Sequence, residues 1–397
     1  MEKKVLIITP YYDPEPFPIN SFVEELVKRN NISEVKVITS LPNYRKYGFY
    51  NGFSAFGPFN ENYEKLKISR LLIVPRFSNS KLAILLFYLS FFISSFIYIF
   101  FFSFFNRNKY DHVLTFCGSP VYVGFIGYFA SKLLNAKSSQ WIQDIWPEAI
   151  ISTVGLRNKR LKIIISKIQS FMWKLSDILF SESESLSDYL RLHLKNKRVV
   201  TLYNPIRTET KVTTSNIKKN NEGLTFSYIG NIGEAQKIEL ILKSFTSAKL
   251  NTCKLNVCGD GSMFKRLSNS YSSSNIIWHG WLDSNKLDQI YSDSDFFVLG
   301  LDSEGRQGLI IPSKIQSYFM NKKPVICISA GSISDLVQKN NAGLTCRSFR
   351  EEDIKQIFKD AQNITNSERK MMANNAYRFY LENFTKSKIV DKFITHI

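Results

Sequence analysis

The sequence has few cysteines, and none of them is placed for a disulfide framework or a metal centre. The five cysteines are scattered along 397 residues, with no CxxC pair and no metal-ligand spacing. This pattern excludes a disulfide scaffold and favours a reducing cytoplasm. The first apolar run is short and soon meets polar and proline residues. We therefore expect a first buried strand there and no signal peptide.

Acidic residues are also scarce relative to basic ones. The chain has 34 Asp and Glu against 52 Lys and Arg, a formal net charge of +18. Such an excess favours an anionic partner. No nucleic-acid-binding motif is visible, and the basic residues are dispersed among aromatic ones, so we expect no nucleic acid. An apolar fraction of 44% and a charged fraction of 22% are ordinary for a globular protein and exclude a disordered or collagenous chain.

Phenylalanine, by contrast, is abundant, and much of it lies in one uncharged segment at 82–105. The segment is long enough to span a bilayer. It lies between two predicted strands, however, and no second span returns the chain. We therefore favour a helix that is partly buried against a sheet and partly inserted in the bilayer surface. A wholly buried core helix and a true span remain alternatives.

A second helical pattern at 157–174 is basic on one side and carries no acid. It predicts either a solvated surface helix or, beside the apolar segment, a face that meets anionic lipid headgroups.

Short β patterns alternate with helical ones along the whole chain. In the first half the strand patterns lie at 4–9, 34–39, 71–74, 112–116, 138–145 and 177–183. A polar stretch at 211–223 follows, and a second series has strand patterns at 224–230, 254–260, 275–280, 296–301, 324–329 and 342–346. This alternation predicts an α/β protein with two doubly wound, Rossmann-like parallel-sheet domains that face each other across a cleft. We expect domains at 1–205 and 206–375, and a C-terminal helix at 376–397 that packs back on the first domain.

Glycine-rich turns follow the first strands of the second series. In such turns backbone amides can approach a phosphate closely, although a plain connection between strand and helix is the alternative. The residues concerned are Gly230, Asn231, Gly233, Gln236 and Lys237 after the first strand, Gly259 and Gly261 after the second, and His279 at the end of the third.

A fourth loop carries the most specific pattern of this half. Pro312 and Ser313 suit the start of a helix, and Lys314 follows them. This segment predicts a diphosphate site, and Glu304 and Arg306 in the preceding loop are placed to reach a bound sugar or phosphate. A capped helix with surface charges is the alternative.

Several stretches in order along the chain carry a family resemblance: IITPYYDPEPFP, VITSLPNYRKYGFYNGF, WIQDIWPEAI, YIGNIGEAQKIELILKSF, VCGDGSMFKRL and IPSKIQSYFMNKKPVI. They resemble GT-B glycosyltransferases of the GT4 class, and within it the WbuB-like, L-fucosamine transferase-like enzymes of O-antigen and capsule biosynthesis. The resemblance implies no metal and no cofactor. It also implies a nucleotide-sugar, usually a UDP-sugar, in the second domain. Phosphates would lie at Gly230, Asn231, Gly233 and the 312–314 segment, and the nucleoside near Gly259 and Gly261.

The first domain would then bind the acceptor, through Asn20, Asn43, Tyr44 and the 143–148 loop with Trp146. Asp144 and Glu148 are the first acid/base or sugar-orienting candidates, and Glu304 is a further catalytic candidate. The chain departs from the family where many members have two glutamates, since Leu309 and Ser317 stand there.

Together these features predict a peripheral enzyme on the cytoplasmic face of the bacterial inner membrane. It would move a sugar from a donor such as UDP-N-acetyl-L-fucosamine to an undecaprenyl-diphosphate-linked saccharide. The alternatives are a UDP-sugar 2-epimerase of GT-B fold and a non-enzymatic basic membrane-binding protein.

Overall fold

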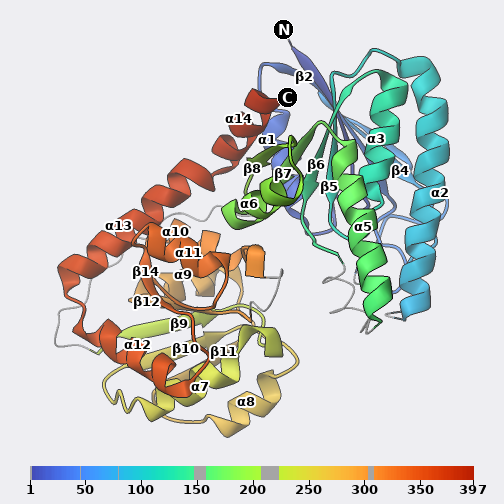
Figure 1. Cartoon of the computed structure of the whole chain (residues 1–397). Coiled ribbons are helices and arrows are strands. Elements are labelled where there is room, and N and C mark those ends of the chain that lie inside the picture. Colours follow the sequence, from blue (N-terminus) through green and yellow to red (C-terminus); the bar gives the residue numbers. More distant parts are fainter. Residues whose placement is uncertain (1, 45, 79, 147–157, 207–222, 303–307) are drawn as a thin grey trace. The chain divides into compact units, whose positions relative to one another are not determined.

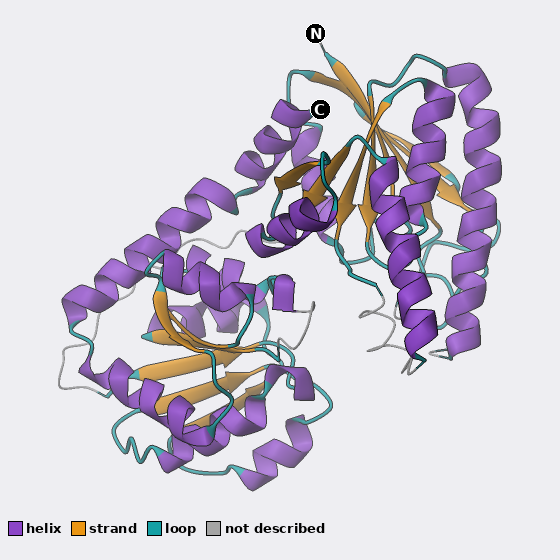
Figure 2. Cartoon of the chain, viewed as in Figure 1, coloured by secondary structure: helices purple, strands orange, loops and turns teal. Residues whose placement is uncertain are grey.

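The computed structural model describes residues 2–44, 46–78, 80–146, 158–206, 223–302 and 308–397. The chain divides into a first unit, Met1–Arg207 with Lys386–Ile397, and a second unit, Thr208–Thr385. Each unit is a sheet covered by helices (Figures 1 and 2). The described residues therefore form two α/β units, as the alternating pattern predicted.

The first unit contains, within its described residues, an eight-stranded sheet in the order β3-β4-β2-β1-β5-β6-β7-β8. All neighbours are parallel except the β3–β4 pair. The strands are β1 (Lys3–Ile8), β2 (Ile32–Ser40), β3 (Asn60–Asn62), β4 (Leu66–Leu71), β5 (His112–Cys117), β6 (Lys137–Ile142), β7 (Ile178–Ser181) and β8 (Arg198–Thr201).

The strand predicted at 71–74 lies earlier in the chain. β4 ends at Leu71, which pairs with Ser40, the last residue of β2. The β2–β4 ladder therefore ends at the first residue of the predicted segment.

Helices cover both faces of this sheet. One layer contains α2 (Lys81–Asn106), α3 (Val123–Leu134) and α5 (Lys159–Leu175), and the other face carries α1 (Pro18–Leu26) and α14 (Lys386–His396) (Figure 1). A further helix, α6 (Glu184–His193), packs on β7 and β8.

The Phe-rich segment forms α2, and only one stripe of it is buried. Ser80 begins the helix by accepting a hydrogen bond from the backbone of Ala83. The buried residues recur every four positions, which is one face of an α-helix: Ala83, Phe87, Phe91, Ser95, Ile99 and Ser103. Many of the other apolar side chains are exposed, among them Phe101 (61%) and Phe105 (78%). The alternative of a wholly buried core helix is therefore wrong.

The second unit has a six-stranded parallel sheet, in the part that is described, with the order β11-β10-β9-β12-β13-β14. Its strands are β9 (Thr225–Ile229), β10 (Lys254–Cys258), β11 (Ile276–Gly280), β12 (Phe296–Gly300), β13 (Val325–Ile328) and β14 (Gly343–Cys346). β9 and β12 pair at the centre, so the strand order reverses there, and ligands bind at the carboxyl ends of strands at such a switch point.

Helices flank this sheet on both faces as well (Figure 2). They are η1 (Glu234–Gln236), α7 (Ile238–Ser247), α8 (Phe264–Ser270), α9 (Ser284–Asp293), α10 (Lys314–Met320), α11 (Ser332–Lys339), α12 (Glu351–Asn363) and α13 (Asn366–Asn383). The core between the sheet and α7 and α12 is built around Phe226, Phe245 and Phe358.

The boundary expected after residue 375 falls inside α13. Thr365 and Glu368 form a capping box that starts this helix, and it continues to Asn383 before α14 begins at Lys386. α13 packs on α10 in the second unit, whereas α14 packs on α1 in the first.

Candidate functional site

The turn after β9 lies directly against the start of α10. Gly230 has a φ of +140°, and a Cβ atom there would come within 2.1 Å of Cε of Lys314. Gly259, at the end of β10, has the same constraint, because its Cβ would lie 2.0 Å from the carbonyl oxygen of Gly230. Glycine is therefore required at both positions. The structure therefore brings together Gly230, Gly259 and Lys314, which were predicted from the first, second and fourth loops.

Lys314 is held at this turn by an aromatic side chain. Its ammonium donates to Oη of Tyr228 at 2.8 Å and lies 4.4 Å from the centre of the Tyr228 ring. The Tyr228 hydroxyl in turn donates to the carbonyl of Asn231 at 2.5 Å. Burial lowers the pKa of Lys314 to about 8. Within the described residues it forms no ion pair with a carboxylate, so its positive charge faces the turn without a counter-charge.

The rest of the turn after β9 is ordered by its own side chains. Asn231 donates to Oε1 of Gln236 at 2.9 Å, and Gly233 lies beneath this contact. Lys237 forms an ion pair with Asp302 at 2.5 Å. Lys237 is therefore neutralised by Asp302, and Lys314 is the better anion ligand of the two.

Three predicted donor residues have structural roles. His279 lies within β11, and its Nε2 contacts Oδ1 of Asn256 at 2.9 Å, while burial lowers its pKa. The carbonyl of Pro312 accepts the first backbone hydrogen bond of the α10 turn, from Ile315 at 3.2 Å. Ser313 is already helical in its backbone and makes no side-chain cap. It does not cap α10 as expected, because a capping side chain needs an extended backbone.

The remaining glycine of the predicted set, Gly261, closes the second loop. A Cβ there would lie 2.4 Å from the carbonyl of Ile232, and its φ is +158°. The candidates Glu304, Arg306 and Glu148 lie outside the described residues.

In the first unit, a buried glutamate joins two loops at the carboxyl end of the sheet. Glu15 is fully buried and accepts backbone hydrogen bonds from Tyr12 (3.2 Å), Asn43 (2.8 Å) and Tyr44 (2.6 Å). Burial raises its pKa to about 7 despite these three donors. Asn20 donates to the Glu15 carbonyl at 2.7 Å. Asn20 and Asn43, predicted to bind acceptor, are therefore buried parts of this junction.

An aromatic cluster with one arginine lies beside that junction. The Arg76 guanidinium lies 5.1 to 5.8 Å from the ring centres of Tyr11, Tyr44, Phe87 and Tyr88. It also donates to the Tyr11 hydroxyl. Tyr44, the third acceptor candidate, is only half-buried and stays accessible at this arginine.

Asp144 lies just beyond β6 and is hydrogen-bonded to a neighbouring loop. Ser119 donates to its Oδ2 at 2.8 Å, and Nε1 of Trp146 donates to the same hydroxyl at 3.1 Å. Burial raises the pKa of Asp144, against the effect of these hydrogen bonds from Ser119. Asp144 and Trp146, two predicted residues, therefore share one hydroxyl at the sheet edge.

Sequence reasoning missed Glu15, Arg76 and Glu182. Glu182 follows β7, is 6% exposed and accepts from Asn204 at 2.6 Å. Burial and then the nearby Asp144 raise its pKa well above the ordinary range. A carboxylate at a strand end was a usable signal for Glu182, whereas Arg76 has no sequence signal, because only the fold gathers its four rings.

Comparisons with known proteins give a family match within the second half of the chain and a fold for the whole of it. Residues 211–379 match the family model described as Glycosyl transferases group 1, which covers less than half of the chain. No curated protein matches the chain.

Solved structures match over nearly the full length. Sucrose-phosphate synthase from Thermosynechococcus elongatus has a TM-score of 0.68 and 12% identity, covering 100% of this chain and 98% of that one. WaaG, a glycosyltransferase involved in lipopolysaccharide biosynthesis, has a TM-score of 0.62 and 12% identity, with 99% of both chains covered.

Anabaena HepE in complex with UDP-glucose has a TM-score of 0.62 and 11% identity, with 100% of both chains covered. These likenesses give the GT-B fold. With the group 1 domain at 211–379, the chain is a glycosyltransferase of GT-B fold.

Proposed function

We propose that the chain transfers a sugar from a UDP-sugar, whose diphosphate binds at the turn after β9. The observation that carries this proposal is the Lys314 ammonium, held against the backbone of Gly230 without a carboxylate partner in the described chain. As the sugar leaves, negative charge grows on the diphosphate, and a fixed cation there stabilises the transition state. The HepE structures with UDP and with UDP-glucose support a uridine nucleotide.

In the first unit, the edge with Asp144 and Arg76 is the proposed acceptor site. The raised pKa of Asp144 suits a carboxyl group that accepts a proton from an acceptor hydroxyl. A half-buried aromatic ring such as that of Trp146 suits stacking on a saccharide. We assign the acceptor class as a saccharide linked to undecaprenyl diphosphate, and the donor as an N-acetylated or deoxy sugar such as UDP-N-acetyl-L-fucosamine, in O-antigen or capsule biosynthesis.

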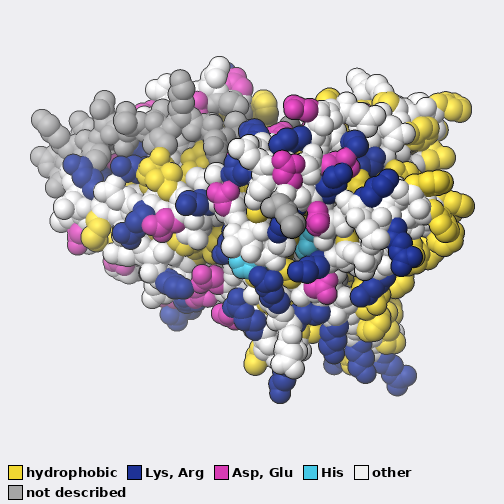
Figure 3. Space-filling model, turned by 90° about the horizontal axis from the view of Figure 1, so that it is seen from above, with side chains coloured by type: hydrophobic (Ala, Val, Ile, Leu, Met, Phe, Trp, Pro, Cys, Tyr) yellow, Lys and Arg dark blue, Asp and Glu magenta, His cyan; other side chains and the backbone are white. Residues whose placement is uncertain are grey.

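The proposed location is the cytoplasmic face of the inner membrane, with the enzyme attached peripherally. α2 is long and apolar enough to cross a bilayer, by length and composition only. Its packed stripe and its exposed apolar side favour a helix lying at the surface instead. Figure 3 shows apolar side chains gathered along the edge of the molecule where α2 lies. α5 adds exposed Ile163, Ile164 and Phe171, with Lys167 between them in the sequence.

The test is incubation of the purified chain with a panel of UDP-sugars and a lipid-linked acceptor, measuring UDP release and the glycosylated lipid. We expect one donor to give acceptor-dependent UDP release. The Lys265→Ala variant, exposed on α8, should match the wild type, and Lys314→Ala should be slow. Absence of transfer from every donor would refute the proposal, and an epimerised UDP-sugar formed without acceptor would identify a 2-epimerase instead.

A further inference from the structure

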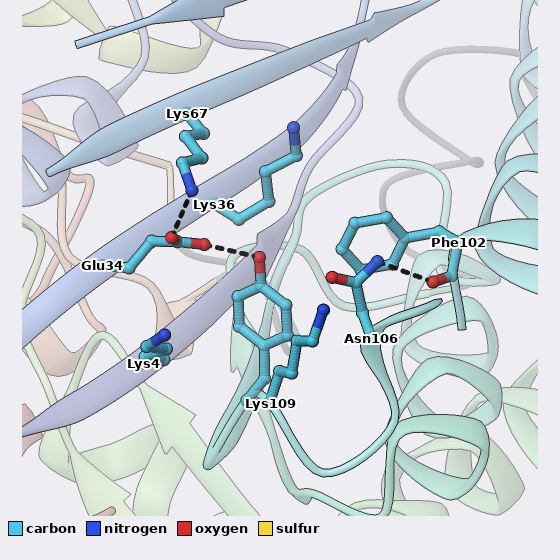
Figure 4. A pocket seen from close by; sticks show the side chains of 8 residues that line it. Lys4, Glu34, Lys36, Lys67, Phe102, Asn106 and Lys109 are labelled. Carbon is cyan, nitrogen blue, oxygen red and sulfur yellow. Dashed lines mark hydrogen bonds and ion pairs between the residues drawn. The ribbon is translucent and has the colours of Figure 1, made fainter. Parts of the chain in front are cut away.

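A basic pocket lies at the edge of the first sheet opposite Asp144 and Glu15. It has a volume of about 350 Å³ and lies where β1, β2 and β4 begin and α2 ends. Four lysines line it, from three strands and from the loop before β5: Lys4, Lys36, Lys67 and Lys109 (Figure 4). The amino ends of the strands are remote from the carboxyl ends, so this pocket is not part of the candidate acceptor site.

Glu34, the one acid among the described lining residues, already has two hydrogen-bond donors. Lys67 binds its Oε2 at 2.5 Å, and the Tyr110 hydroxyl donates to its Oε1 at 2.7 Å (Figure 4). Although burial opposes it, these two hydrogen bonds hold the pKa of Glu34 below its usual range. Lys4, Lys36 and Lys109 make no ion pair within the described residues. The lining therefore carries three positive charges that its own carboxylate does not neutralise.

Lys36 is the most informative of these three. Its side chain is 8% exposed, and its ammonium donates to Oγ of Ser69 at 2.7 Å. Burial lowers its pKa. A buried ammonium with a hydroxyl as its recorded acceptor is costly for the fold. Its place in the lining of a cavity is better explained by an anion that enters the cavity.

An apolar groove continues from this pocket along α2. The groove has a volume of about 550 Å³ and shares Phe102 and Asn106 with the basic pocket. Its lining includes the exposed side chains of Leu72, Ile97 and Phe101. Tyr98 lines the groove and donates to the same Ser69 hydroxyl as Lys36. The two cavities therefore adjoin, and together they offer a candidate site with a cationic end and an apolar end.

We propose that this site binds one anionic phospholipid, with the phosphate headgroup among Lys4, Lys36 and Lys109 and an acyl chain in the groove along α2. The charge of the pocket selects an anion, and the adjoining groove selects an anion that carries a hydrocarbon chain. The inference rests on the proposed membrane attachment and adds to it a specific lipid class and a specific site.

The experiment compares the full chain with four paired variants, three that change charges and one that changes the apolar groove. Lys4→Ser with Lys109→Ser removes two pocket charges, and Lys4→Arg with Lys109→Arg retains them. Lys195→Ser with Arg198→Ser removes two exposed charges at the β8 edge, at the other end of the sheet. Each protein is titrated with dihexanoyl phosphatidylglycerol below its micelle concentration, with dihexanoyl phosphatidylcholine, and with inorganic phosphate.

We expect the wild type to prefer phosphatidylglycerol over both other probes. The serine pair at the pocket should weaken phosphatidylglycerol binding about thirtyfold, since each lysine near an anionic lipid contributes about fivefold. The arginine pair and the β8 pair should stay within a few fold of the wild type. Ile97→Ser with Phe101→Ser should weaken both lipids without affecting phosphate.

Equal weakening by the pocket pair and the β8 pair would overturn the proposal, because net charge alone would then explain binding. Inorganic phosphate that binds as tightly as the lipid would identify a phosphate site without lipid. UDP binding by the same variants separates this inference from the proposed function. If the variant with Lys4→Ser and Lys109→Ser binds both UDP and the lipid as tightly as the wild type does, the lipid site is refuted and the proposed function is not.

Discussion

At the scale of single residues, the Lys314 ammonium is the proposed binding group for the diphosphate in the second unit. Its contacts are a hydroxyl, a ring and a glycine turn, and burial already lowers its pKa to about 8. A diphosphate would supply the counter-charge that the described surroundings lack, and a charge-assisted hydrogen bond of this kind is stronger than a neutral one.

Replacing Lys314 by alanine should weaken UDP binding by about ten- to a hundredfold, as expected for a hydrogen bond to a charged group. Because Lys314 loses its proton as the pH rises through about 8, wild-type affinity for UDP should fall between pH 7 and 9.5. The alanine variant should be weak at every pH in that range. Isothermal titration with UDP checks both results. Equal pH dependence in the two proteins would exclude Lys314 from the site.

The buried Glu15 should make the stability of the first unit depend on pH. Its pKa rises from 4.5 to about 7 in the folded state, because burial disfavours the carboxylate. The stabilising contribution is therefore complete below pH 4.5 and is lost as the pH rises through 7. The expected loss is about 3 kcal/mol across that window.

Glu15→Gln should remove this pH dependence. Urea unfolding at pH 5 and pH 7.5 would show a smaller change in the midpoint for the variant than for the wild type. The exposed Glu64→Gln is the control and should behave as the wild type does. A variant that loses as much stability as the wild type between the two pH values would contradict the assignment.

At the scale of secondary-structure elements, α2 combines two functions in one helix. A residue every four positions fits into the first unit, and the remaining side chains stay apolar and exposed. Helical geometry separates the two sets, so the exposed side can change without disturbing the packed stripe.

Replacing Phe101, Phe104 and Phe105 together by serine removes three apolar side chains from the exposed side of α2. The partition coefficient of the protein onto vesicles that contain phosphatidylglycerol should therefore fall by at least about tenfold. The three side chains are 61%, 66% and 78% exposed, so the melting temperature should change little. Leu192→Ser with Trp281→Ser, at 75% and 78% exposure, is the control. The fraction of protein that floats with the vesicles is the measurement. If the triple variant floats as the wild type does, attachment depends on α5 and not on these residues of α2.

At the scale of the whole molecule, the chain leaves the first unit and returns to it. α14 brings Phe393 between β5, β7 and α1, where its fully buried ring lies 5.1 Å from that of Phe22 and 5.4 Å from that of Phe180. The last helix therefore completes the core of the first unit, although it follows the second in the sequence.

Phe393→Ala should lower the unfolding free energy of the first unit by about 3 to 5 kcal/mol, as for other buried phenylalanines. UDP affinity, which belongs to residues of the second unit, should stay unchanged. The exposed Thr395→Ala is the control. Denaturant unfolding followed with and without UDP tests this, and a parallel loss of UDP affinity would show that the two units are not independent.

The sequence alone was sufficient for the fold class and for the enzyme class. Repeated alternation of β and helical patterns predicted two parallel-sheet units, and the motifs predicted a glycosyltransferase, and both are confirmed. Gly230, Gly259 and Lys314 were identifiable because glycine at a strand end and a lysine at a helix start are local signals.

Only the tertiary structure decided which of these residues meet and which have other tasks. Lys237 and Lys314 are equivalent candidates in the sequence, but in the structure Lys237 forms an ion pair with Asp302. Asn20 and Asn43 are buried around Glu15. The basic pocket joins residues from 4 to 110 that share no pattern in the sequence. Local periodicity follows from backbone geometry, so it can be read along the chain. Charge pairing and burial depend on residues that are distant in sequence, so only the folded chain reveals them.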